Sequence, residues 1–448
     1  MHGAGPEQRS ERRLHSPPTW KLHGRAVGEL FQVGTNTAAD PVEMSPESVT
    51  VIGGGLSGLF AGYYLARQGR QVRLLEKAER LGGLVQTTAT PHGISEHAAR
   101  SLVNSGALED LCDDLGVRLL AANATSKKRF IYRRVPRRIP LGPSEALIAL
   151  AKFLGAAASR RLAPRPGETV TVWGQRVLGK AAVDFLLGPA LSGVYAGDPS
   201  ELSASLILGP HFRKNREKQP STRLPSLTVV PEGGMQDLVE ALERKLGELG
   251  VVVVKGRGFE FASPNLSHPH VICVPLGDLP SLLGEHFSEL AAQFSRVRML
   301  PIISVTGWFD ETSDDIAGFG CLFTEEEGRK SLGVLFNSSM FENRGPHRSE
   351  SWILGGARSP QMIRAGDDEI VAAVVHDRGD LLRAPSPQPL SCHIVRYPQG
   401  LPYYDLELEG VLSRLQLPPH LYLMGNYTGG IGLTKILDRA RRLAASLN

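Results

Sequence analysis

The stretch from Ser48 to Val85, SVTVIGGGLSGLFAGYYLARQGRQVRLLEKAERLGGLV, contains the pattern that decides the fold. Residues 49–52 are apolar enough to form a short buried strand. An amphipathic pattern from Leu56 predicts a helix that stops at Gly69, and residues 72–75 predict a second strand. A strand, a turn, a helix and a second strand in this order indicate an α/β domain.

Three glycines, Gly53, Gly55 and Gly58, occupy the turn between the first strand and the helix. The first permits a tight turn, the second lets the main chain approach a diphosphate, and the third lets the helix pack on the sheet. Glu76 ends the second strand, where a carboxylate can accept a hydrogen bond from a ribose hydroxyl. The unit therefore predicts a dinucleotide site, and the alternative is a glycine-rich turn in some other α/β unit.

The residues after the second strand distinguish between dinucleotides. Arg80, Gly82 and Gly83 complete a Glu-x-x-x-Arg-x-Gly-Gly run. This run resembles that of the glutathione-reductase-type FAD enzymes, in particular their amine-oxidase-like branch, whereas a nicotinamide dehydrogenase has no need of the second glycine pair. The resemblance implies FAD as the cofactor. The cofactor-binding positions that it implies here are Gly53, Gly54, Gly55, Leu56, Ser57, Gly58, Glu76, Lys77, Arg80, Gly82, Gly83 and Leu84.

The composition is that of a globular protein with more than one lobe. A chain of 448 residues exceeds one ordinary domain, and 42% hydrophobic with 21% charged residues is typical of a soluble fold. The longest apolar run, residues 146–158, is shorter than the ~18–20 residues of a membrane span, so we expect a buried or interfacial helix there. The four cysteines lie far apart in the sequence, which argues against a disulfide framework and fits a reducing compartment.

Residues 1–47 are rich in Pro, Gly, Ser and Arg and show no sustained hydrophobic period, so we expect a disordered tail. The alternative hypothesis is that Met44 is the natural start. The segment has no apolar core of a secretory signal, and its acidic residues argue against an organelle transit peptide. A cytoplasmic location is therefore expected.

Two later segments resemble one family of flavoproteins. Residues 96–101, EHAARS, are similar to the Glu-x-Gly-Pro-Arg/Asn segment that passes under the flavin in protoporphyrinogen oxidases. Residues 189–203 contain Pro189, the run GVYAGDP and a final Leu-Ser, which match a dense pattern of the same family. A helix end with a tight turn explains these residue types but not the whole string. The chain thus resembles the protoporphyrinogen/coproporphyrinogen oxidase family.

The resemblance covers roughly residues 48–447 and implies an α/β fold with three parts. These are a glutathione-reductase-type, Rossmann-like FAD-binding domain, an inserted α-helical membrane-binding lobe, and a substrate lobe with a mixed or antiparallel sheet. Alternating apolar and polar residues over 297–360 also favour an antiparallel sheet. The expected boundaries are 48–103, 213–290 and 391–448 for the FAD domain, 104–212 for the helical lobe and 291–390 for the substrate lobe.

The activity that the resemblance implies is oxidation of protoporphyrinogen IX to protoporphyrin IX in haem synthesis. Three two-electron steps would use dioxygen as acceptor and give hydrogen peroxide. The macrocycle gives hydride to the flavin, so the protein supplies position and a dry pocket, and no acid–base catalytic residue is expected. The same reaction on coproporphyrinogen III is the alternative. A non-catalytic flavin-binding homologue is the alternative from another class, and it is supported only by Ala98-Ala99 and Thr434-Lys435-Ile436, which depart from the family pattern.

The resemblance also implies substrate residues. Arg100 is expected to hold a propionate through two hydrogen bonds, with a surface or flavin-side position as the alternative. Gly193 is expected to lie against the macrocycle, and Leu322 and Phe336 are expected to form its wall unless they are core residues of a sheet. The helix after the glycine-rich turn near the C-terminus is expected to point its N-terminus at the flavin. The remaining cofactor positions are Ala98, Ala99, Arg100, Ser101, Phe259, Gly425, Ile431, Gly432 and Leu433.

Residues 127–138, KKRFIYRRVPRR, carry seven cations interleaved with apolar side chains. One interpretation is a hairpin with a solvated basic face. The other is attraction to anionic lipid or to a substrate's propionates, at roughly 1 kcal/mol per cation near an anionic surface. No other motif supports nucleic-acid binding, and the scattered histidines lack the spacing of a metal site. The expected partners are a porphyrinogen, dioxygen and the cytoplasmic face of a membrane, and a homodimer is left open.

Overall fold

The structure, a computed structural model, describes residues 48–212, 222–310 and 316–447. Residues 1–47 lie outside the described residues. The expectations of a disordered tail and of a start at Met44 therefore stay predictions.

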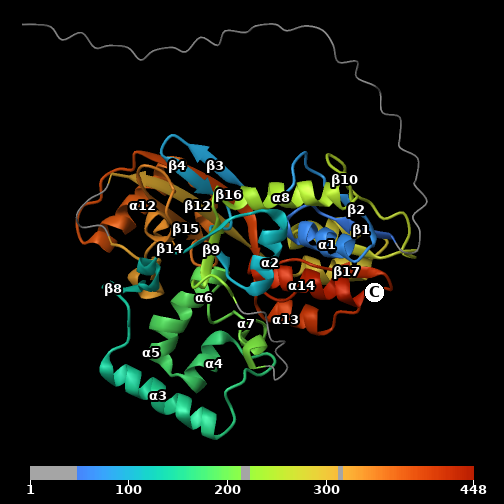
Figure 1. Ribbon diagram of the computed structural model, residues 1–448. Helices are drawn as coiled ribbons and strands as arrows, with labels where there is room; N and C mark the ends of the chain where they lie inside the picture. The colour runs from blue at the N-terminus through green and yellow to red at the C-terminus, as the bar shows by residue number, and fades with distance from the viewer. Residues whose placement is uncertain (1–47, 213–221, 311–315, 448) are drawn as a thin grey trace, which may run out of the picture. The chain divides into compact units, whose positions relative to one another are not determined.

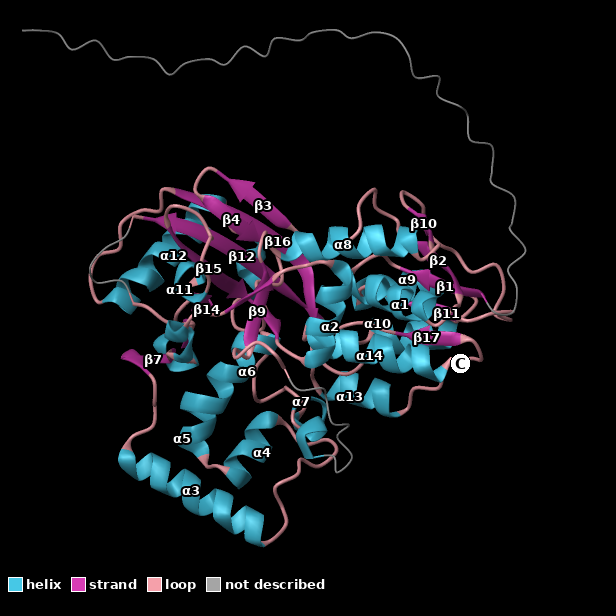
Figure 2. Ribbon diagram, viewed as in Figure 1, coloured by secondary structure: helices cyan, strands magenta, loops and turns pink. Residues whose placement is uncertain are grey.

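A five-stranded parallel sheet organises the first lobe (Figures 1 and 2). The chain starts in the middle of this sheet and adds strands on both sides, so the strand order reverses between β1 and β11. In open parallel sheets, ligands bind beyond the carboxyl ends of the strands at such a switch point. The strands in spatial order are β10 (Val252–Val254), β2 (Gln71–Leu75), β1 (Ser48–Ile52), β11 (His270–Ile272) and β17 (Leu421–Leu423).

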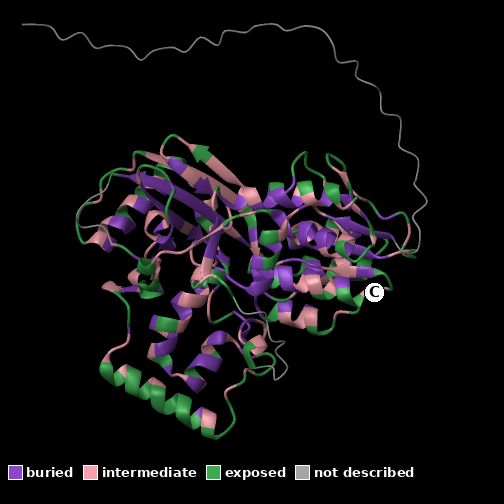
Figure 3. Cartoon of the chain, in the orientation of Figure 1, coloured by how far each residue is buried: buried purple, intermediate pink, exposed green. Residues whose placement is uncertain are grey.

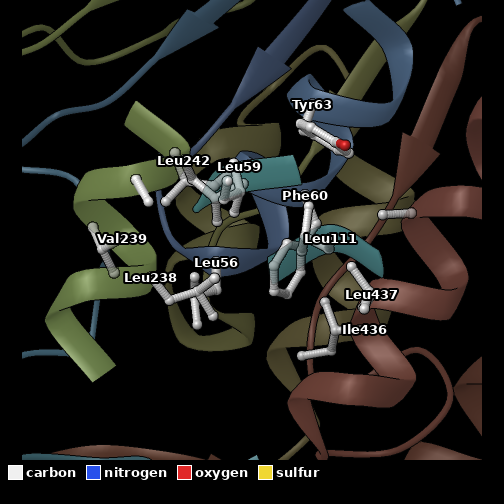
Figure 4. Packing of buried hydrophobic residues seen from close by; sticks show 14 of the residues in the cluster. Leu56, Leu59, Phe60, Tyr63, Leu111, Leu238, Val239, Leu242, Ile436 and Leu437 are labelled. Carbon is white, nitrogen blue, oxygen red and sulfur yellow. The ribbon is translucent and has the colours of Figure 1, made fainter. Parts of the chain in front are cut away.

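Three helices pack together in the core of this lobe: α1 (Leu56–Arg67), α8 (Met235–Glu248) and α14 (Leu433–Ser446). Figure 4 shows Leu56, Leu59 and Phe60 of α1 between the leucines of α8 and the Ile436–Leu437 pair of α14. Each fully buried side chain of this kind contributes roughly 1.5–3 kcal/mol. The predicted strand–turn–helix–strand unit is confirmed by β1, α1 and β2.

A seven-stranded sheet forms the second lobe, and α12 (Asp367–Leu382) packs on it. Its strand pairs are antiparallel except for β13 with β7, which run parallel. The antiparallel pairing expected for residues 297–360 is thus confirmed. In spatial order the strands are β16 (Ser391–Pro402), β12 (Met299–Phe309), β15 (Arg348–Gly355), β14 (Ser331–Leu335), β13 (Gly320–Phe323), β7 (Arg129–Arg133) and β8 (Val135–Arg137).

The strands place the lobe boundaries differently from the expected ones. The hairpin β7–β8 was expected in the helical lobe, and β16 in the FAD domain, yet all three strands belong to the seven-stranded sheet. The basic run buries Ile131 and Tyr132 at this sheet, and apolar burial outweighs the polar character of its neighbours. Likewise α2 (Gly106–Leu115) packs in the core of the first lobe.

The helical part of the chain begins only at α3 (Pro143–Ala158). In α3 the sole buried residue is Ala156, and Figure 3 shows this helix as almost wholly exposed. Within the described part of the chain, no helix is long and apolar enough to span a bilayer. The other helices of this part are α4 (Val170–Val177), α5 (Lys180–Ala182), α6 (Gly188–Tyr195) and α7 (Ala204–Ile207).

Short elements complete the fold. The strands β3 and β4 pair antiparallel and form a hairpin. A small third sheet contains β5, β9 and β6. The bounds of the short elements are β3 (Thr87–Thr90), β4 (Gly93–Glu96), β5 (Leu102–Val103), β6 (Leu119–Ala121), β9 (Thr228–Pro231), α9 (Leu279–Leu283), α10 (Ser288–Ser295), α11 (Asn337–Met340) and α13 (Leu406–Ser413).

Glu350 is the centre of a buried charge cluster in the second lobe. Its carboxylate accepts hydrogen bonds from Arg348 Nε at 2.8 Å and from Arg378 Nε at 3.1 Å. The indole Nε1 of Trp352 donates to it at 3.1 Å. Glu350 and Arg378 are almost entirely shielded from solvent, so this carboxylate compensates positive charge that water cannot reach.

We expect Glu350→Gln to lower thermal stability, because it removes the anion while leaving the buried guanidinium groups in place. Breaking such a buried pair costs about 3–5 kcal/mol. The melting temperature of the purified protein is the measurement, and Glu369→Gln, an exposed carboxylate on α12, is the matched control. Equal melting temperatures for the two variants would contradict the structural role of Glu350.

Candidate cofactor and substrate site

The glycine turn after β1 forms a cradle of main chain. A Cβ added to Gly58 would lie 1.8 Å from the carbonyl oxygen of Gly53, so the first turn of α1 rests directly on the loop. Gly55 is the N-cap and has no side chain to occupy the first N–H groups of the helix. These N–H groups, at Leu56, Ser57 and Gly58, are therefore available to an anion.

Glu76 is fixed at the end of β2 by two main-chain donors. Its Oε2 accepts from the N–H of Gly54 at 2.6 Å, and its Oε1 accepts from the N–H of Ala78 at 2.8 Å. The carboxylate therefore lies over the glycine turn, where a ribose bound to that turn would meet it. Its neighbour Lys77 forms an exposed ion pair with Asp278 at 2.9 Å.

The second glycine pair packs against the first. The N–H of Gly82 donates to Gly54 O at 2.8 Å, and a Cβ added to Gly83 would lie 3.1 Å from the Cα of Gly55. Arg80 donates from Nη2 to Gly83 O at 2.6 Å, so this predicted cofactor residue supports the turn. Leu84, which follows the turn, is 39% exposed. The two glycine runs thus form one surface of closely packed main chain.

A third glycine-rich turn, residues 425–432, follows β17 at the same edge of the parallel sheet. The hydroxyl of Tyr404 donates to Asn426 O and accepts from the N–H of Gly430 at 3.0 Å. The turn leads through Ile431 and the N-cap Gly432 into α14, which begins at Leu433. The N-terminus of a long helix therefore lies at the edge where the glycine turn after β1 also lies.

Arg100 lies between the two lobes. Its Nη1 donates to Ala98 O at 3.1 Å, and its Nη2 donates to the hydroxyl of Ser304 on β12. The Nε atom is buried and has no hydrogen-bond partner. Burial lowers the pKa of Arg100 to about 10, and no ion pair among the described residues includes it. The backbone of Ala98, Ala99 and Ser101, also predicted to meet the cofactor, passes through the same junction.

The predicted substrate residues fall into two environments. Gly193 on α6 lies against Leu322 on β13, because an added Cβ would be 2.3 Å from its Cδ2. A larger residue at Gly193 would thus disturb this packing whether or not a ligand binds. Phe336 has no exposed surface and lies in the core of the seven-stranded sheet, with the guanidinium of Arg348 5.3 Å from its ring centre. Phe336 is therefore a core residue of the sheet, which was the alternative to the expected role of lining the macrocycle site.

Phe259, predicted to meet the adenine, lies at an open hollow of about 510 Å³ beside β2. Its ring contacts those of Phe261 at 4.9 Å and His270 at 5.8 Å between centroids. The hollow is lined by Arg73, Leu75, Arg257, Gly258, Phe259 and Glu260. An adenine contact remains a prediction at this position.

One group among the described residues has the spacing of metal ligands: His376, Asp377 and Asp380 on α12. Arg329 Nη1 lies 2.5 Å from Asp380 Oδ2, and the N–H of Ser331 donates to Asp377 at 2.9 Å. Protein groups already compensate both carboxylates, so we assign no metal to this group.

Several residues that shape the junction were assigned no role from the sequence, although Glu96 and His97 belong to the EHAARS segment. Glu96 accepts from the N–H of Met235 at 3.0 Å and so caps α8. His97 contacts His393 of β16, with 4.9 Å between ring centroids, and burial lowers the pKa of His97 to about 4. The tyrosine that holds the third glycine turn was also missed, because long-range contacts of this kind leave no local pattern.

The donor set fits FAD. Free helix N–H groups suit the diphosphate, the fixed carboxylate of Glu76 suits a ribose, and the closely packed glycines let the cofactor approach main chain. The residues present therefore suit the diphosphate and a ribose of the cofactor.

Comparisons with known proteins agree with this geometry. The family model for flavin-containing amine oxidoreductases matches residues 56–258. The mitochondrial protoporphyrinogen oxidase of Nicotiana tabacum is 26% identical over 90% of this chain and 95% of its own. The human protoporphyrinogen oxidase is 26% identical over 89% of this chain and 98% of its own.

Solved structures show the same fold. A protein from Exiguobacterium sp. 255-15, provisionally called a protoporphyrinogen oxidase, superposes with a TM-score of 0.72 at 23% identity, over 90% of this chain and 99% of its own. Cyclohexylamine oxidase from Brevibacterium oxydans IH-35A superposes with a TM-score of 0.64 at 16% identity, over 90% of this chain and 99% of its own.

The fold and the site together define an FAD-dependent flavoprotein of the amine-oxidase-like type. Its cofactor is FAD. Within this type, the chain is similar in sequence to protoporphyrinogen oxidases over about nine tenths of its length.

We expect Gly58→Ala to abolish or strongly reduce FAD retention, because the new Cβ would meet the Gly53 carbonyl at 1.8 Å and displace the helix from the loop. The measurement is the ratio of visible flavin absorbance to protein absorbance after purification. Gly247→Ala, a helical glycine of α8 with open space around it, is the control and should keep its flavin. A yellow Gly58→Ala protein with the wild-type ratio would contradict the cradle.

Proposed function

We propose that this protein oxidises protoporphyrinogen IX to protoporphyrin IX, with dioxygen as the acceptor and hydrogen peroxide as the product. The names of its relatives supply the substrate class. The observation that favours a carboxylate-bearing substrate is Arg100, a half-buried guanidinium with one buried, unpartnered donor. The carboxylate of Glu96 acts on its charge but forms no ion pair with it. A propionate would satisfy that donor and compensate the charge.

The protein's part in this reaction is to position the substrate and exclude water. Arg100 would anchor one propionate, while its bonds to Ala98 O and Ser304 fix the direction of the guanidinium. Leu322, backed by Gly193, would offer an apolar surface to the macrocycle. Bound FAD supplies the hydride acceptor, which is the chemistry that no side chain here provides. Holding a flat substrate against it in a dry junction is the contribution of the chain.

Arg100→Ala should raise the KM for protoporphyrinogen IX about 10- to 100-fold, because a charge-assisted hydrogen bond contributes about 1.5–3 kcal/mol. FAD content should stay at the wild-type level. Arg100→Lys keeps the positive charge but loses the paired N–H donors of the guanidinium, so its KM should lie between those of the wild type and Arg100→Ala. Steady-state fluorescence of the porphyrin product gives the constants, and the exposed Arg118→Ala is the control. An unchanged KM in Arg100→Ala would refute the anchoring role.

Coproporphyrinogen III is the alternative substrate, since it differs only in carrying two more carboxylates. Assaying both porphyrinogens side by side with the same enzyme decides between them. Faster turnover of protoporphyrinogen IX supports the proposal. Faster turnover of coproporphyrinogen III would make that compound the substrate instead. If neither porphyrinogen bleaches the flavin in the absence of oxygen, the protein is a non-catalytic flavoprotein.

We propose further that α3 docks on an anionic membrane surface. Its apolar side chains Leu147, Leu150 and Leu154 are 67%, 54% and 57% exposed, which is unusual for a helix facing water. Exposed cations flank it on both sides: Arg137, Arg138, Lys152, Arg160 and Arg161. Apolar side chains surrounded by cations match the interface of a bilayer with anionic headgroups, as on a cytoplasmic leaflet.

The double variant Leu150→Ser/Leu154→Ser should lose co-sedimentation with vesicles that contain phosphatidylglycerol, because it removes much of the exposed apolar area. Val252→Ser, an equally exposed apolar residue on β10, should bind vesicles normally. Wild-type binding should weaken at high salt. If the wild-type protein ignores vesicles and instead dimerises in solution through α3, the membrane proposal fails and the helix is a homodimer contact.

A further inference from the structure

Arg439 is a half-buried cation whose Nε and Nη1 atoms are buried behind the glycine turn that precedes α14. It lies on the second turn of α14, and its side chain reaches back towards the helix N-terminus. Nη2 donates to Gly425 O at 2.6 Å, and Nη1 lies 2.7 Å from where a Cβ on Gly429 would be. The guanidinium thus lies directly against the main chain of the 425–432 turn.

The charge of Arg439 has no anionic counterpart within the described residues. Its Nε and Nη1 atoms are buried without a hydrogen-bond partner, and no ion pair there includes it. Burial lowers its pKa, and the titratable groups that act on it are Tyr404, Tyr427, Cys273 and Arg442. None of these is a carboxylate, so the protein by itself offers no anion to the buried part of this guanidinium. Such a charge is costly unless an anion lies nearby.

The position of Arg439 is close to the diphosphate cradle. Gly425 follows β17, and the carboxyl end of β17 is two strands from that of β1. With neighbouring strands about 4.8 Å apart, the guanidinium is about 10 Å from the glycine turn at Gly53. Cys273 lies between the glycine turn and Arg439. Its carbonyl oxygen would be 2.9 Å from a Cβ on Gly53, and its thiol is one of the groups that act on the pKa of Arg439.

The other cations near the cradle already have partners. Arg80 donates to the carbonyls of its own turn, and Lys77 pairs with Asp278. Lys435, whose Nζ lies 3.3 Å from where a Cβ on Gly430 would be, is exposed to solvent and also has an interaction partner. Arg439 is therefore the charge best placed to act on an anion at the helix start. The 425–432 turn covers the N–H groups of Arg439, so its positive charge acts on the anion through electrostatic attraction at a distance and not through a hydrogen bond. At a charge-to-charge distance of about 10 Å and an effective dielectric constant near 20, the attraction raises the affinity for a ligand roughly tenfold for each negative charge that the ligand carries.

We propose that Arg439 is a positioning residue for the cofactor, in which its half-buried positive charge compensates the diphosphate of FAD. Binding of the doubly charged diphosphate supplies an anion to this cation, and the cation in turn raises the affinity for the dinucleotide. The inference rests on the FAD cofactor and is independent of the substrate, so it survives if the porphyrinogen assignment fails.

Arg439→Gln tests this proposal, because it removes the charge but keeps an amide donor for Gly425 O. Equilibrium dialysis of the purified holoprotein, read as released flavin fluorescence, gives the FAD dissociation constant. We expect it to rise about 100-fold for the two charges of the diphosphate, equivalent to about 2.7 kcal/mol, and the difference from wild type should shrink at high salt. Arg439→Lys, which keeps the charge, should retain most of the affinity.

Competition separates the diphosphate from the rest of the cofactor. ADP should displace FAD from the wild-type protein far better than adenosine does, and Arg439→Gln should narrow this preference. Arg442 is an exposed arginine on the same helix, and Arg442→Gln should change neither the FAD dissociation constant nor the preference for ADP over adenosine. The midpoint potential of the bound flavin should stay constant across the variants.

Three results would overturn the proposal. One is an unchanged FAD dissociation constant in Arg439→Gln. Another is an equal loss of FAD affinity in Arg439→Gln and Arg439→Lys with an unchanged preference for ADP over adenosine. Arg439 would then only hold the conformation of the turn. The third is a shifted flavin potential with unchanged FAD affinity, which would place the action of the charge at the ring. Far-UV circular dichroism of each variant confirms that it is folded.

Discussion

The contact of one glycine with another part of the main chain is the constraint on which this structure depends. Gly58 lies so close to the Gly53 carbonyl that no other residue fits, and this contact sets where α1 begins relative to β1. The same loop receives the hydrogen bond from Gly82 and the carboxylate of Glu76. Sheet, helix and cofactor cradle are therefore fixed together by main-chain proximity, and side-chain packing in the core follows from it.

The run GVYAGDP is the joint between the lobes, which accounts for its dense match to a family pattern. Tyr195 packs on Tyr404, with 5.0 Å between ring centroids, and the N–H of Asp198 donates to the hydroxyl of Tyr403 at 3.1 Å. Ala357, beyond β15, donates to Ala196 O at 2.8 Å. The helical part, the seven-stranded sheet and the segment leading into the third glycine turn thus meet at a few residues.

Local patterns in the sequence were enough to predict the first lobe. The glycine spacing, the period of α1 and the acidic end of β2 are all short-range signals, and the structure confirms the elements that they predict. The lobe boundaries and Phe336 depended on tertiary pairing, because a short alternating run such as β7 can join any sheet with a free edge. Arg439 was missed for a related reason: its role depends on what surrounds a single arginine in the middle of a helix, which no spacing records.

The seven-stranded sheet draws its strands from residues 129 to 402 of the chain, and its parallel pair joins β7 to β13 across nearly two hundred residues. Synthesis from the N-terminus therefore makes the β7–β8 hairpin long before its neighbour exists, and the outer strand β16 emerges close to the end of translation. Until then the nascent chain exposes unpaired strand edges, which are the segments most open to mispairing during elongation.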